Sequence, residues 1–141
     1  MLPITELMPA LSRTEIGDLG ERLVAEWSGG TLAPRNNVGC DVRSAAHGRI
    51  QVKARSHASR HLNWFHIKNV DANTFDYLVL IEFEADLSLA GAWGMTHAAI
   101  SDHAHSVVVD ARGNRITKLA IRGDWKTRVD AIDLAIAQRP R

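Results

Sequence analysis

The sequence predicts an α/β layered domain with a mixed β-sheet, and three observations support this prediction. Apolar residues recur at helical spacing near the start of the chain, several short strand-like segments follow, and a second helical pattern occurs near the end. The overall order of helix, strands, helix, strands and helix is typical of helices packed on a central sheet.

The first helix is expected from about residue 13 to residue 28. Residues 12–15 (Ser-Arg-Thr-Glu) have the form of a capping box, and the glycines at 29–30 would end the helix. Gly17 and Gly20 each weaken a helix by about 1 kcal/mol relative to alanine, so their presence indicates close packing against another element. The apolar residues at helical spacing are Ile16, Leu19, Leu23, Val24 and Trp27.

Turn residues separate the short segments that follow, which favours a meander of antiparallel strands. Residues 76–83 are apolar almost throughout, as in a strand buried on both faces in the middle of a sheet. Residues 89–95 would form its neighbour. The shorter expected strands are 31–34, 40–43 and 49–55.

Two further helices and a hairpin are expected in the rest of the chain. Thr96 could cap a short helix that runs through Ser101, and residues 106–110 and 116–121 would form a hairpin around a turn at 112–114. Asp124 would cap a final helix. The apolar stripe of that helix would consist of Val129, Ile132 and Ile136.

The composition fits a single globular domain over residues 1–141. The chain is 45% hydrophobic and 23% charged, and it can bury a core without disulfides. A formal net charge of +1 does not identify a binder of polyanions, so nucleic-acid binding must be argued from local features. The chain has one cysteine and no leader pattern at its start, which favours a cytoplasmic protein. We also expect no membrane contact, because no apolar run approaches the roughly 20 residues of a membrane span.

Asp41, Gln51 and Lys53 flank a short polar break and could meet at one point. A strand over residues 49–54 would send Gln51 and Lys53 to one face, together with Arg49, while the alternate residues enter a core. An acid, an amide and an amine together suit a divalent metal and a phosphate. The same row could also be the solvated face of a strand.

This order of residues resembles the PD-(D/E)XK nuclease superfamily. The pattern consists of Gly20-Glu21 on the first helix, Asp41 at the start of a strand and Gln51-x-Lys53 on the next strand. It is most similar to Holliday-junction resolvases and Mrr-like restriction nucleases, and it extends from about residue 14 to residue 83. The resemblance implies a restriction-endonuclease-like three-layer core, with a central mixed sheet flanked by helices.

The resemblance also implies a magnesium-dependent phosphodiesterase. Asp41 would be a metal-binding carboxylate, Gln51 would supply a metal-facing oxygen, and Glu21 would be the helix acid that completes the site. Lys53 would orient or deprotonate the attacking water and offset charge on the phosphate. Mg²⁺, with Mn²⁺ as the alternative, prefers oxygen ligands and is usually held by one or two carboxylates plus water and substrate phosphate.

Gln51 is the main departure from the family pattern, because it stands where an acid is usual. Some members of the superfamily are similar in using glutamine, which keeps the oxygen but loses the negative charge. The resemblance therefore implies an endonuclease acting on nucleic acid, with DNA favoured. The alternative is a catalytically weak or inactive nuclease-fold module that binds nucleic acid or a partner within a defence, repair or replication complex.

A structural protein with no nucleic-acid partner is the third hypothesis. It would be favoured if Gln51 and Lys53 lay on the core side of their strand or far from Asp41.

Substrate contacts are expected from the segment that follows Lys53. Arg55 and Arg60 lie in a stretch that mixes cations with the aromatic residues Trp64 and Phe65, which suits a phosphate backbone or an unpaired base. The alternative is a polar loop followed by a strand whose aromatic residues pack inward. By analogy with resolvase-like families, a homodimer would place two sites where they address both strands of a duplex.

Two other candidate sites are disfavoured. His103 and His105, with His97 nearby, lack a second pair of ligands at a recognised zinc spacing. Cys40 has an acid beside it and no evident paired histidine, so we expect a structural cysteine rather than a nucleophile.

Overall fold

The computed structural model describes residues 13–34, 40–56, 64–100, 104–120 and 130–131. The helix is α2 (Arg13–Ser28), and the two 3-10 helices are η2 (Val70–Ala72) and η3 (His97–Ala99). The strands are β1 (Thr31–Leu32), β2 (Val42–Ser44), β3 (Gly48–Arg55), β4 (Trp64–Lys68), β5 (Tyr77–Phe83), β6 (Leu89–Thr96), β7 (Ala104–Val109), β8 (Arg115–Ala120) and β9 (Asp130–Ala131). Among these helices, none has the length and apolar character needed to cross a membrane.

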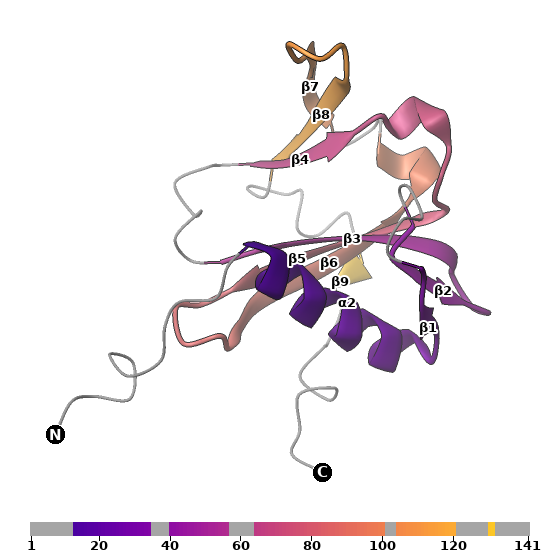
Figure 1. Ribbon diagram of the computed structural model, residues 1–141, viewed down its shortest axis with the longest axis vertical. Helices are drawn as coiled ribbons and strands as arrows, with labels where there is room; N and C mark the ends of the chain where they lie inside the picture. Colours follow the sequence, from indigo (N-terminus) through magenta and orange to yellow (C-terminus); the bar gives the residue numbers. More distant parts are fainter. Residues whose placement is uncertain (1–12, 35–39, 57–63, 101–103, 121–129, 132–141) are drawn as a thin grey trace, which may run out of the picture.

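The strands form two sheets that lie on top of each other. The larger sheet has six strands in the order β1-β2-β3-β5-β6-β9, and the smaller has three in the order β4-β8-β7. β3 and β5 are parallel, whereas the other neighbouring pairs of the larger sheet are antiparallel. Figure 1 shows α2 against one side of the larger sheet and the smaller sheet on the other side. The predicted α/β class with a mixed sheet is confirmed.

The first hydrophobic core lies between α2 and the larger sheet. Gly20 sits at a point of close approach to β3, because a Cβ atom added to it would lie 2.9 Å from the Cβ of Ala54. The close packing predicted for Gly20 is therefore confirmed. The same prediction is wrong for Gly17 as far as the described residues go, since a Cβ there would meet none of their atoms within 4 Å. The buried residues of this core are Ile16, Leu23, Val24, Val42, Ile50, Val52, Tyr77, Val79, Ile81, Phe83 and Ala92.

The second core lies between the two sheets. In β4, Phe65 and Ile67 are buried whereas His66 and Lys68 are exposed, which is the alternation of a strand covered on one face. β5 contributes residues to both cores, as predicted for a strand buried on both faces. The buried residues of this second core are Phe65, Ile67, Phe75, Leu78, Leu80, Trp93, Met95, Ile100 and Leu119.

The expected helical layer on the second side of the larger sheet is not found in the described part of the chain. The connection from β3 to the parallel strand β5 contains β4 and η2, and the three-stranded sheet covers this side. The physical reason is the two-residue period of residues 64–68, which gives a strand an apolar face but gives a helix no continuous stripe.

The predicted final helix is contradicted at the two positions where the structure can test it. Asp130 and Ala131 form β9, which pairs antiparallel with Gly94 and Trp93 of β6. This pairing satisfies backbone groups along the outer side of β6. The predicted cap, Asp124, and the stripe residues Val129, Ile132 and Ile136 lie outside the described residues.

The predicted short helix and hairpin are present with small shifts. The Thr96 hydroxyl accepts a hydrogen bond from the Ala99 backbone N–H, which caps η3, while Ser101 lies outside the described residues. β7 and β8 pair antiparallel around a turn in which Asp110 Oδ1 accepts from the N–H groups of Arg112 and Asn114.

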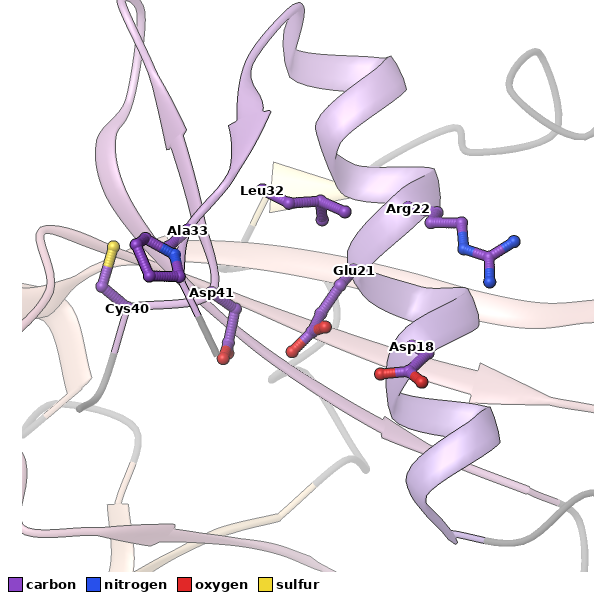
Figure 2. A pocket seen from close by; sticks show the side chains of 8 residues that line it. Asp18, Glu21, Arg22, Leu32, Ala33, Cys40 and Asp41 are labelled. Atoms are coloured by element: carbon purple, nitrogen blue, oxygen red, sulfur yellow. The ribbon is translucent and has the colours of Figure 1, made fainter. Parts of the chain in front are cut away.

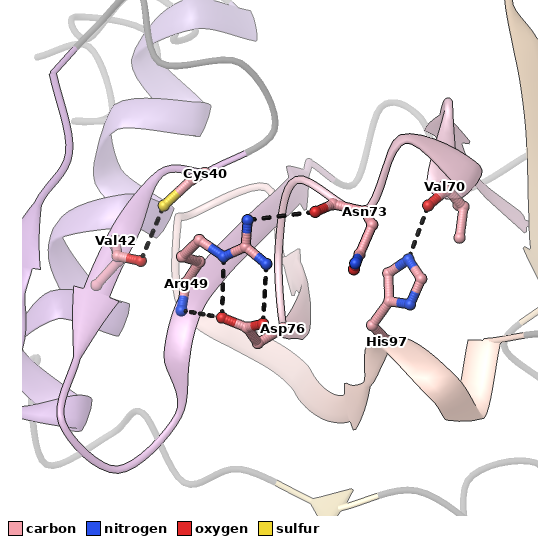
Figure 3. Close-up of polar contacts among 7 residues, drawn as sticks. All are labelled: Cys40, Val42, Arg49, Val70, Asn73, Asp76 and His97. Atoms are coloured by element: carbon pink, nitrogen blue, oxygen red, sulfur yellow. Dashed lines mark hydrogen bonds and ion pairs between the residues drawn. The ribbon is translucent and has the colours of Figure 1, made fainter.

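A hydrogen-bonded pair joins the beginning of β3 to the beginning of β5 (Figure 3). The Arg49 guanidinium donates to both carboxylate oxygens of Asp76, with Nε–Oδ2 at 3.1 Å and Nη2–Oδ1 at 3.0 Å. The Asp76 N–H in turn donates to the Arg49 carbonyl at 2.8 Å. These bonds hold the parallel register in which Gln51 lies beside Leu78. Arg49, which was predicted to share a face with Gln51, thus stabilises the sheet.

Candidate functional site

Asp41 is held against β3 immediately before β2 begins. Its backbone N–H donates to the Ile50 carbonyl at 2.8 Å, and its carboxylate Oδ2 accepts from the Val52 N–H at 2.8 Å. The carboxylate therefore lies at the backbone that directly follows Gln51. Among the described residues, the hydrogen bond from Val52 engages only this one oxygen of the carboxylate.

Glu21 and Asp41 line the same hollow, which has a volume of about 390 Å³. Figure 2 shows both carboxylates directed to one side of this hollow, Glu21 from α2 and Asp41 from the chain before β2. The structure thus brings together two of the predicted site residues that are far apart in the sequence. The described residues that line the hollow are Asp18, Glu21, Arg22, Leu32, Ala33, Pro34, Cys40 and Asp41.

Gln51 is buried, with 8% of its surface exposed, and it is not among the described residues that line the hollow. Its side-chain oxygen, Oε1, has no hydrogen-bond partner within the described part of the chain. Leaving a buried polar atom unsatisfied costs about 1–3 kcal/mol, so such an atom in a folded protein calls for an explanation. A bound ion or water molecule at Oε1 would remove this cost.

Lys53 lies on the same strand two residues after Gln51 and is partly buried. Burial lowers the pKa of its ammonium below the ordinary value of 10.5; the charge of Lys68 lowers the pKa further, and the nearby Asp41 carboxylate opposes the shift. The contribution of Asp41 to this pKa indicates that the predicted acid and amine lie within electrostatic range of each other. A lysine of this kind gives up its proton more easily than one in water.

Arg55, which was predicted to contact substrate, is engaged inside the protein. Its Nη2 atom lies 2.9 Å from Glu82 Oε2, and both side chains are only 12% exposed. The guanidinium also lies over the Phe65 ring at 4.5 Å. These contacts join β3, β5 and β4, so the described geometry indicates a packing role. Arg60, the other predicted contact, lies outside the described residues.

Asp18 and Arg22 line the hollow but are absent from the predicted site. They lie three residues before and one residue after Glu21 on α2, and the spacing of i and i+3 puts Asp18 on the same helix face as Glu21. Helical spacing around Glu21 was therefore the signal that could have identified Asp18.

The disfavoured sites are consistent with structural roles (Figure 3). Cys40 is 2% exposed, and its Sγ atom donates weakly to the Val42 carbonyl at 3.5 Å. The Nε2 atom of His97 donates to the Val70 carbonyl at 2.7 Å, and its ring meets Phe75 edge-on. His103 and the side chain of His105 lie outside the described residues.

The residues near Asp41 fit a magnesium ion better than a zinc ion. Among the described side chains, no group of three or more His, Cys, Asp or Glu residues is arranged to hold a metal. The predicted donors are the carboxylates of Glu21 and Asp41 and the amide oxygen of Gln51, and Mg²⁺ accepts such a sparse set of oxygens because it retains several waters. The specific observation that fits a bound cation is the buried oxygen of Gln51, which has no hydrogen-bond partner in the described part of the chain.

Comparison of the chain with protein-family models and with curated proteins found no match to either.

Proposed function

We propose that this chain is a metal-dependent endonuclease of the PD-(D/E)XK type that hydrolyses phosphodiester bonds in nucleic acid, with DNA favoured. The observation that carries the proposal is the position of Asp41. Its carboxylate shares a hollow with Glu21 and lies against the backbone beside Gln51, whose buried oxygen has no hydrogen-bond partner among the described residues. The order of α2, the β2–β3 hairpin and a parallel β5 also agrees with the restriction-endonuclease-like core of that superfamily.

In this proposal the side-chain oxygens of Glu21, Asp41 and Gln51 would hold Mg²⁺ or Mn²⁺. A bound metal would polarise a phosphoryl oxygen and lower the pKa of a coordinated water. Asp41 is suited to its role because the Val52 N–H fixes one carboxylate oxygen, so the other is oriented before any ligand binds.

Lys53 would act at the attacking water through its Nζ atom. In its charged form the ammonium offsets the negative charge of the phosphate. Because its pKa is lowered by burial, the neutral amine is more accessible than in a solvated lysine and can accept a proton from water.

A binding module with a weak metal site is the alternative, and one observation favours it. Gln51 contributes no negative charge, and only Glu21 and Asp41 among the proposed ligands are anionic, so metal affinity would be low. Such a module would still bind nucleic acid or a protein partner.

The proposal is tested with purified protein on linear, supercoiled, single-stranded and branched DNA and on RNA, with Mg²⁺, Mn²⁺ or EDTA. The variant Asp41→Asn keeps an acceptor for the Val52 N–H but removes the charge. We expect metal-dependent cleavage that falls in this variant by at least the roughly 10–100-fold that changes around metal ligands cause. Lys53→Gln should also lose activity while retaining metal binding.

The matched control is Glu26→Gln, an exposed acid on the same helix as Glu21. It should cleave like the unmodified chain, whereas Glu21→Gln should be impaired. Cleavage that persists in EDTA, or that survives Asp41→Asn, would refute the mechanism. Salt-sensitive binding without any cleavage would support the binding module instead.

A further inference from the structure

The free edge of the smaller sheet is unusually apolar. In the described part of the chain β7 pairs with β8 alone, so its other side forms the edge of this sheet. Val107, Val108 and Val109 are consecutive on this strand and are 47%, 42% and 67% exposed. Proteins usually protect such edges with charged residues, proline or a covering segment, because unpaired backbone groups accept another strand.

A hollow opens beside this edge, on the side of the smaller sheet that faces the larger one. It has a volume of about 250 Å³ and is lined by Val70, Asp71, Ile100, Ala104, Val107, Arg115 and Thr117. Val107 is paired with Thr117, and Val109 is paired with Arg115, so both valines lie on the side of the sheet that carries the hollow.

We propose that β7 pairs with β7 of a second copy of this chain, antiparallel about a twofold axis at Val108. In this register Val109 of each copy lies opposite Val107 of the other, at the mouth of the hollow. The most exposed valine of the edge is thus covered by the partner, and two three-stranded sheets become one continuous sheet. The assembly stops at two copies, because each copy uses the same β7 edge and leaves no second β7 edge for a third copy.

The lack of charge along this edge favours a second copy as its occupant, because no charged residue blocks pairing of the strand with itself. Residues 106–109 contain no charged side chain, so pairing the segment with itself brings no like charges together. The same register sets Ser106 of one copy opposite Asp110 of the other. The few residues that pair indicate a small interface, below about 1,200 Å², and therefore a weak dimer whose formation depends on concentration.

The first test is sedimentation velocity over a wide concentration series of the full chain. We expect the unmodified protein to pass from monomer to dimer as concentration rises. Val108→Lys should remain monomeric throughout, with an unchanged circular dichroism spectrum and melting temperature, because the side chain is solvent-exposed. An unmodified protein that stays monomeric, or a dimer that persists in Val108→Lys, would overturn the proposal.

The second test examines the register. Val108→Cys places a thiol on the proposed axis, so a short bis-maleimide reagent should link two copies rapidly. The matched control, Leu32→Cys, has similar exposure at 52% but lies on β1, and Cys40 is 2% exposed. Equal cross-linking of the two variants, or none in Val108→Cys at concentrations that give dimer, would exclude this register. Neither test depends on nuclease activity, so the proposed dimer can be refuted or supported independently of the proposed function.

Discussion

Gln51 combines two properties that are seldom found together. It is 8% exposed, and its Oε1 atom lacks a hydrogen-bond partner within the described residues. The residue beside it on β5 is Leu78, which belongs to the apolar core between the sheets. A glutamine in this position either carries an energetic penalty or has a ligand in solution. The two cases make different predictions for substitution.

Replacing Gln51 with leucine removes the unsatisfied oxygen and keeps a similar volume. In EDTA we expect the free energy of unfolding of Gln51→Leu to rise by about 1–3 kcal/mol, the cost of an unpaired buried polar atom. In Mg²⁺ the unmodified chain gains stability from binding while the variant gains less, so the difference should shrink. Urea denaturation with and without Mg²⁺ measures both quantities.

Gln51→Glu is the complementary variant, because it restores the usual acid of the family pattern. A further carboxylate beside those of Asp41 and Glu21 should destabilise the metal-free protein and enlarge the rise in melting temperature that Mg²⁺ produces. If Gln51→Leu is destabilised in EDTA, Oε1 has a partner that is not a metal. If Mg²⁺ stabilises all three proteins equally, Gln51 is not a ligand.

At the scale of the elements, the contact of α2 with β3 holds Glu21 near Asp41. The contact is close because Gly20 has no side chain: a Cβ there would lie 2.9 Å from Ala54 Cβ and 3.3 Å from Ile81 Cδ1. The Ala54 methyl is fixed to the strand backbone and cannot turn aside. A larger residue at position 20 must therefore move the helix away from the sheet.

Gly20→Ala and Gly17→Ala form a matched pair on one helix. Both should gain about 1 kcal/mol of helix propensity, but only Gly20→Ala meets the strand, and overpacking typically costs about 1–3 kcal/mol. We expect Gly17→Ala to raise the melting temperature, and Gly20→Ala to be less stable than Gly17→Ala and to lose the proposed nuclease activity. The double variant Gly20→Ala/Ala54→Gly should recover part of the activity. Equal stabilisation by both single variants would show that the contact is not close.

At the scale of the whole molecule, two of the described ion pairs join β3 to β5, which are distant in the sequence. Arg55 and Glu82 join β3 to β5 in a largely buried position, and the Arg55 guanidinium over Phe65 extends this link to the smaller sheet. Arg49 and Asp76 join the same strands at their other end, where about half of each side chain is exposed. Hydrogen bonds from Arg49 lower the pKa of Asp76 from 3.8 to about 2.

The shifted pKa of Asp76 predicts how stability depends on pH. Because the pKa is lower in the folded state, the unfolded chain binds more protons, and the stabilisation present above about pH 4 is lost as pH falls toward 2. Asp76→Asn should show a shallower loss of stability between these values. The pKa of Asp86 and that of Asp110 are also lowered, so part of the slope will remain.

Urea denaturation at several pH values measures this slope, and Asp71→Asn serves as the control at an exposed ion pair on η2. The effect of Asp76 should decrease in high salt, because the pair is solvent-exposed. An unchanged slope in Asp76→Asn would show that its pKa is not lowered in solution.

The sequence by itself determined those helices and strands whose pattern of apolar and polar residues can be recognised within one short segment. Helix α2 begins and ends where its capping pattern and its two glycines predicted, and β5 is buried on both faces as its apolar run predicted. The alternation in β3 also predicted that Val52 enters a core, and the structure shows that this is the core between α2 and the larger sheet. These features depend on neighbours along the chain, so local patterns are sufficient to predict them.

Only the tertiary structure decided what covers each face and which distant side chains meet. Alternation placed Gln51 on the face opposite Val52, but it could not reveal that a second sheet buries that face. Nor could it assign Arg55 to Glu82, 27 residues away, rather than to a substrate. The meeting of Glu21 with Asp41 likewise depends on the packing of α2 against the larger sheet. The reason is physical: secondary structure sets the direction of a side chain, whereas its partners come from the packing of separate elements.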